Sequence, residues 1–144
     1  MRTINNIMSM LDWNMTLEKQ SEGRRIAKEL GTIAPFIQPV TPEYNKNVWK
    51  NCAIIVSEQE DEKIKPYLCE LLEWLQDMNW PGAFCIYNRL LRYKDNKSLF
   101  NAIDISYRRA EKCHDSIWER NIDALVSERF ILVETPNDYG CRSW

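Results

Sequence analysis

Residues 64–83 read IKPYLCELLEWLQDMNWPGA, and this stretch decides the fold. Its apolar residues recur three and four positions apart, which is the spacing of one face of an amphipathic helix. Pro66 lies near the start of this helix, where its missing N–H costs little, and the run NWPG at 79–82 ends it. The apolar face consists of Ile64, Leu68, Leu71, Leu72 and Leu75. The sequence therefore predicts a helix over 64–78 and a second helix that begins at Ala83.

The same helical spacing recurs on both sides of this stretch. Thr16, Asn96 and Ser116 are predicted to cap or open helices, Ser116 through the capping-box pattern S-x-x-E. We expect helices over 4–11, 16–30, 48–60, 64–78, 83–93, 96–110 and 116–128. In the helix after Asn96 the residues expected to point inward are Leu99, Phe100, Ile103, Tyr107 and Ala110. Residues 130–133 fit a short strand, a packed extended arm or a helical extension, and 129–144 form a C-terminal arm or tail.

The composition indicates one all-α domain over residues 1–144. Apolar residues make up 44% of the chain and charged residues 28%, as in average soluble domains. Four glycines leave little material for the tight turns of an all-β fold. The N-terminus lacks the features of a signal peptide, and no apolar run is long enough to cross a membrane. We therefore expect a cytoplasmic protein without a membrane partner.

A faint internal repeat favours a helical solenoid. Val48-Trp49 and Ile117-Trp118 both open predicted helices, and Val-Ser-Glu follows at 56–58 and at 126–128, where both helices are expected to end. The offset of 69 to 70 residues is twice the length of a helix-turn-helix repeat unit. We predict a short α-solenoid of about six to eight helices, with a compact helical bundle as the alternative.

The sequence contains no recognisable catalytic or metal-binding motif. Its five cysteines include no CxxC pair, so we expect buried structural thiols and no disulfide framework or zinc site. The single histidine, His114, follows Cys113, but neighbouring side chains on a helix point about 100° apart, which argues against a nucleophile–base pair. We therefore expect no enzyme activity, no cofactor and no metal.

Charge is segregated along the chain although the net charge is only −2. Residues 58–77 carry seven acids and two lysines, a charge of −5, whereas residues 78–112 carry +4. Glu70, Glu73 and Asp77 share one side of the predicted helix. This row is a candidate docking surface for a basic partner, unless neighbouring helices neutralise it. The near-balanced net charge gives no reason to expect direct binding of nucleic acid.

Tryptophans are frequent, with six in the chain. Trp49 and Trp118 lie in apolar stripes and are predicted to be core residues. Trp74 lies one position from the apolar stripe of its helix and Trp80 lies in the polar turn at 77–81, and each fits either the core or an interface. Asp77 and Asn79 fit a contact edge or a purely structural role, in which Asp77 orients the turn and Asn79 binds carbonyls at the helix end.

Residues 45–125 resemble a family of small bacterial proteins of uncharacterised function. The run LLEWLQDMNWPGA at 71–83, preceded by KIKPYLCE, carries the resemblance. It implies a short HEAT-like fold and a role suspected for similar proteins, immunity against polymorphic toxins. It implies no catalytic residues. Residues 1–44 and 129–144 lie outside the recognisable segment.

We therefore expect a non-enzymatic protein-binding protein, most specifically an immunity protein that neutralises a toxin domain, possibly a nuclease. A general helical-repeat adaptor is the alternative, and a monomer is favoured. The predicted partner-binding residues are Glu70, Glu73, Trp74, Asp77, Asn79 and Trp80.

Reversing the charge of Glu70, Glu73 and Asp77 tests this surface. If the row docks on a basic partner, binding should weaken by at least about 1 kcal/mol, the usual scale of interface charge pairs. Isothermal titration calorimetry measures the change, and unaltered affinity would remove these residues from the site.

Overall fold

The computed structural model describes residues 3–39 and 44–134, and within these ranges the chain forms helices and turns without a strand. The α-helices are α1 (Ile4–Leu11), α2 (Leu17–Lys28), α3 (Trp49–Ser57), the single turn α4 (Asp61–Ile64), α5 (Leu68–Glu73), α6 (Ala83–Leu91), α7 (Asn96–Lys112) and α8 (Ser116–Glu134). Four 3-10 turns, η1 (Ala34–Phe36), η2 (Lys46–Val48), η3 (Lys65–Tyr67) and η4 (Trp74–Gln76), join them. The all-α prediction is confirmed.

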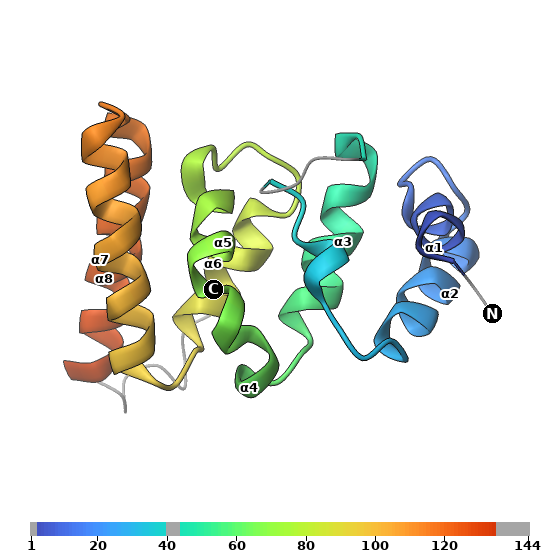
Figure 1. Ribbon diagram of the computed structural model, residues 1–144, viewed down its shortest axis with the longest axis horizontal. Helices are drawn as coiled ribbons and strands as arrows, with labels where there is room; N and C mark the ends of the chain where they lie inside the picture. The colour runs from blue at the N-terminus through green and yellow to red at the C-terminus, as the bar shows by residue number, and fades with distance from the viewer. Residues whose placement is uncertain (1–2, 40–43, 135–144) are drawn as a thin grey trace.

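The helices follow one another in layers along the longest axis of the molecule (Figure 1). The layers are α1 with α2, η1 with α3, α5 with α6, and α7 with α8. Helix α2 packs on α3, α3 on α6, and α6 on α8, while α5 packs on α7. Each layer therefore packs mainly against the layers next to it, which is the pattern of contacts in a short helical solenoid.

The internal repeat joins equivalent helices of this stack. Helices α3 and α8 are the second helices of the second and fourth layers, so an offset of 69 to 70 residues spans two layers. Trp49 and Trp118 lie at the start of these helices and are both buried, as predicted. The expected end of the last helix at Glu128 is wrong, because α8 continues to Glu134. Residues 130–133 are thus a helical extension, and 135–144 lie outside the described residues.

Aspartates cap two of the helices in place of the predicted residues. The Thr16 side chain accepts a hydrogen bond from the Lys19 amide, which confirms that cap. Helices α7 and α8 are instead capped by Asp95 and Asp115, whose carboxylates accept from the Ser98 and Trp118 amides, so Asn96 and Ser116 are the first helical residues. A carboxylate suits the positive end of the helix dipole as well as a neutral cap does.

A buried polar network holds the first layer on the second. The Asn51 side-chain amide on α3 donates to the Leu11 carbonyl at 2.7 Å and to Gln20 Oε1 at 3.0 Å. Its oxygen accepts from Arg24 at 2.6 Å. The Gln20 amide in turn donates to the carbonyls of Trp13 and Met15. The α1–α2 hairpin, which precedes the recognisable segment, is therefore part of the same stack.

The predicted helix over 64–78 is broken into α4, η3, α5 and η4. Pro66 cannot donate a backbone hydrogen bond, so the helix tightens into the η3 turn around it. Side chains satisfy carbonyls near the other end: Trp118 Nε1 donates to the Leu72 oxygen, Asn121 to that of Leu75, and Gln76 to that of Glu73. Helix α8 therefore supplies hydrogen-bond donors to the ends of α5 and η4, and it packs against η4.

Arg129 of α8 performs the same role for α6. One guanidinium nitrogen donates to the carbonyls of Leu90, Leu91 and Tyr93 at 2.9, 3.0 and 2.7 Å, and another donates to the Asn96 side chain. The residue is buried, and this burial lowers the pKa of its guanidinium. The negative end of the α6 dipole compensates the buried cation.

Replacing Arg129 by Met should lower the free energy of unfolding by about 2–4 kcal/mol, because three carbonyls lose a buried donor. Urea unfolding followed by circular dichroism measures the change. Arg120→Met, at an exposed position of the same helix, is the matched control and should stay within about 0.5 kcal/mol of the wild type. Equal stability of the two variants would contradict this role.

Candidate functional site

Trp74 is the centre of the turn that the sequence singled out. Its side chain is 0% exposed, and its indole Nε1 donates to the Pro81 carbonyl at 2.9 Å. The ring also packs edge-on against Trp49, with 6.2 Å between centroids. The prediction that Trp74 binds a partner is therefore wrong, since a fully buried indole already satisfied within the fold has no surface to offer.

Gly82 completes this turn. Its φ of +85° lies in the left-handed region, where residues with a Cβ are strained. A Cβ added there would lie 2.5 Å from that of Ala53 and 3.1 Å from the Trp49 carbonyl. The glycine thus allows the start of α6 to approach the backbone of α3 closely.

Trp80 lies at the edge of the same cluster and is only partly buried. It packs edge-on against Trp49 with 5.4 Å between ring centroids. The Lys46 ammonium lies 5.6 Å from the Trp49 ring and 5.7 Å from the Trp80 ring, within the range of cation–π attraction. Part of Trp80 faces solvent, beside a cation.

The two polar residues of the turn, Asp77 and Asn79, have different roles. The Asp77 carboxylate accepts from the Asn79 backbone amide at 2.8 Å, which confirms that Asp77 orients the turn. Asn79 is exposed, and the predicted binding of its side chain to the helix end is replaced by the bonds from Gln76 and Asn121. The hydrogen bonds of the turn therefore stabilise the fold, and Asn79 lies at its surface.

The acidic row is partly neutralised by a neighbouring helix. Glu73 pairs with Arg109 of α7 at 3.0 Å, and its side chain is 16% exposed. Glu70 is half-buried. Of the six predicted partner-binding residues, Glu70, Asp77, Asn79 and Trp80 keep access to solvent, while Glu73 is committed largely to Arg109.

Other acids between 58 and 77 are paired as well. Glu58 pairs with Lys28 of α2 at 2.8 Å. Asp61 pairs with Arg89 and accepts from the Lys94 amide. Desolvation alone would raise the pKa of Asp61, but these hydrogen bonds and charges outweigh it and lower the pKa. Three of the seven acids between 58 and 77 are therefore paired with bases of other helices.

Cys113 and His114 form the connection between α7 and α8. His114 has a φ of +55°, its amide donates to the Glu111 carbonyl, and the Asp115 amide donates to that of Ala110. These are the two hydrogen bonds of a Schellman motif, so the histidine is a helix C′ residue. Cys113 is exposed, which corrects the expectation of buried thiols at this position. Cys52 does fit that expectation, because it is fully buried and its burial raises the thiol pKa.

Metal and membrane features are absent from the parts of the chain that the structure describes. Residues 3–39 and 44–134 contain no group of three or more His, Cys, Asp or Glu side chains that could hold a metal ion. No helix within these ranges is long and apolar enough to span a bilayer.

Exposed apolar side chains on α7 and α8 are the feature that sequence reasoning missed. Phe100 was expected to point inward but is 39% exposed. Phe130 is 63% exposed, and Ile105 and Ile117 are exposed as well. Phe100 adjoins the buried Leu99 and lies at the edge of the apolar stripe of α7, so a stricter fit to the helical period would have placed it outside.

A family model for a domain of unknown function, DUF5071, matches residues 49–135. The match covers more than half of the chain. The chain belongs to the DUF5071 family. The matched segment runs from the first residue of α3 to the end of α8, so it contains the tryptophan turn and leaves the α1–α2 hairpin outside. Comparison with curated proteins and with solved structures gave no match.

Gly82→Ala tests the structural role of the turn. The left-handed φ and the contact with Ala53 should together lower the free energy of unfolding by about 2–4 kcal/mol, measured by urea unfolding. Gly31→Ala is the matched control, because an added Cβ there meets nothing within 4 Å, and it should be neutral or slightly stabilising. A tolerated Gly82→Ala would contradict this account of the turn.

Proposed function

We propose that this DUF5071 protein is a non-enzymatic protein-binding module, and most specifically a cytoplasmic immunity protein that binds and neutralises a bacterial toxin domain. Stacked helix pairs, which we place with HEAT-like repeats, offer broad rigid surfaces for grasping another protein. The layers are fixed to one another by buried polar contacts such as those of Asn51 and Arg129, so little ordering would be needed on binding.

The observation that carries the proposal is the apolar surface of the last layer. The terminal unit of a solenoid is normally polar on its outer side, because no further unit covers it. In α7 and α8, Phe100 and Phe130 are instead exposed. Exposed aromatic side chains among polar neighbours are typical of protein interfaces.

A nuclease domain is the toxin type that we favour. A nuclease must hold phosphates in a basic groove, and acidic side chains on the immunity protein would cover such a groove with opposite charge. Helices α7 and α8 carry exposed carboxylates at Asp104, Glu111 and Asp123, in addition to the exposed phenylalanines.

The alternative is a helical-repeat adaptor that joins two partners. It is favoured by a second exposed apolar cluster at the opposite end of the stack, formed by Trp13, Met15 and Leu17 at the α1–α2 connection. This cluster lies outside the segment that the family model matches, so it would belong to this member in particular.

Co-expression with a toxin domain encoded beside this chain tests the immunity role. We expect the two proteins to elute together from a size-exclusion column and the toxin to lose its activity in the complex. Phe130→Ser should weaken the complex, whereas Leu17→Ser at the other end should leave it intact. Absence of a complex with every adjacent toxin would overturn the immunity proposal, and dependence on Leu17 as well as Phe130 would favour the adaptor.

A further inference from the structure

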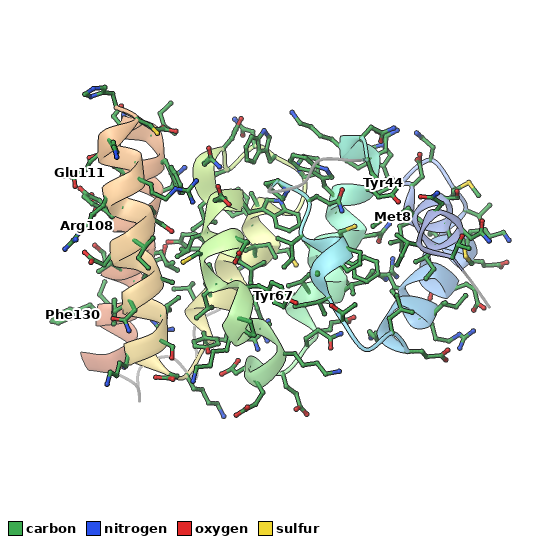
Figure 2. All side chains as sticks on the ribbon, viewed as in Figure 1. Met8, Tyr44, Tyr67, Arg108, Glu111 and Phe130 are labelled. Atoms are coloured by element: carbon green, nitrogen blue, oxygen red, sulfur yellow. The ribbon has the colours of Figure 1, made fainter. Side chains whose placement is uncertain are left out.

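The outer side of the last layer brings together two rows of side chains, which we name the end face. Residues three or four positions apart share one side of a helix, and the rows follow this spacing. The end face consists of Phe100, Asp104, Tyr107, Arg108 and Glu111 on α7 and of Glu119, Asp123 and Phe130 on α8. Figure 2 shows Arg108, Glu111 and Phe130 pointing away from the rest of the molecule at this end of the stack.

Tyr107 shows that the two rows adjoin. Desolvation raises the pKa of its phenol, and the charges of Asp123, Glu119 and Glu111 raise it further, together with a hydrogen bond to Glu119. Carboxylates from both helices therefore surround one half-buried tyrosine.

Charge on the end face is strongly one-sided. Four carboxylates accompany one guanidinium, that of Arg108, which pairs with Asp104 at 3.3 Å while both side chains remain mostly exposed. An exposed pair of this kind contributes little stability and can be exchanged for a partner's groups. By contrast, Glu73 in the row predicted from sequence is held by Arg109. The end face is thus an acidic surface that stays open to solvent.

Aromatic rings complete the surface. Phe100 and Phe130 are exposed, and Tyr107 lies among the carboxylates on the same side of the helix pair. Lysine and arginine side chains can pair with the carboxylates, and an arginine can also stack on an aromatic ring. Aromatic anchors with a charged rim have the anatomy of a protein-binding site.

We propose that the end face is the docking site for a basic protein surface, one that presents Arg or Lys side chains around an apolar patch. This inference rests on the proposed protein-binding function and names its site and the chemistry of its partner. Two copies of the end face would oppose eight carboxylates with two guanidinium groups, so charge disfavours self-association through it.

Nuclear magnetic resonance of the full chain tests the proposal directly. The probe is a short synthetic helix-forming peptide with Arg and Leu on one face, and the same peptide with Glu in place of Arg is its control. We expect amide shift changes on α7 and α8 around Tyr107 with the Arg peptide alone. Changes centred on Glu60–Glu70 instead, equal binding of the Glu peptide, or no binding would overturn the proposal.

A charge-reversed variant sharpens this test. Glu111→Lys with Asp123→Lys should weaken binding of the Arg peptide by about tenfold or more and reduce its dependence on salt. Glu60→Lys with Glu62→Lys, an equal charge change at exposed positions around α4, is the matched control and should leave affinity unchanged. Circular dichroism would establish that both variants fold, and equal affinity of the two variants would overturn the proposal.

The toxin complex separates this inference from the proposed function. If the wild-type protein binds the toxin and the Glu111→Lys, Asp123→Lys variant binds it equally well, the immunity role stands and the proposal that the end face is the docking site is wrong. If wild-type protein binds no adjacent toxin, the immunity role fails and the peptide experiment still decides the end face. A wild-type dimer in sedimentation velocity that Phe130→Ser dissociates would assign the face to a second copy and overturn the proposal.

Discussion

The hydrogen bond from the Trp74 indole to the Pro81 carbonyl is the constraint on which the middle of the stack depends. It holds the connection between η4 and α6 against the buried Trp74 ring. It also fixes the position of Pro81, directly before the left-handed Gly82. Helix α6 then starts against Ala53 of α3 and extends to α8. At its far end, Arg129 donates to the carbonyls of Leu90 and Leu91. Trp74 and Gly82 therefore set the start of α6 against α3, and the bonds from α8 hold its other end.

The sequence predicts the existence of the helices well, because apolar spacing depends only on neighbours along the chain. It predicts the ends less well. Choosing Asp95 over Asn96 as the cap depends on a backbone angle that composition does not reveal, and the burial of Arg129 depends on its contact with the end of α6. A charged residue near the C-terminus looks like solvent-exposed surface until α6 is placed beside it. Contacts of this kind join positions more than 30 residues apart, and a single sequence contains no signal for them.

The same limit applies to the candidate site. Glu70, Glu73 and Asp77 share a helix side, but Arg109 lies 36 residues from Glu73 and removes that acid from the surface. The tryptophan run is distinctive because it builds a turn, and Trp74 is lost to binding for that reason. Conversely, no local pattern joins Tyr107 to Glu119 and Asp123. They meet only because the Schellman turn at His114 folds α8 back along α7.

The amide of Asn51 joins the segment that the family model matches to the hairpin that precedes it. Asn51 lies on α3, inside the matched segment, yet its hydrogen bonds go to Leu11, Gln20 and Arg24, outside it. Without the first hairpin, this primary amide would lose these three partners and would face water on the surface of α3. Where the hairpin is present, an apolar side chain at position 51 would instead leave the Leu11 carbonyl, Gln20 and Arg24 without this buried partner. The family model therefore begins at a helix that is hydrogen-bonded to the preceding hairpin, and no linker separates the two in packing.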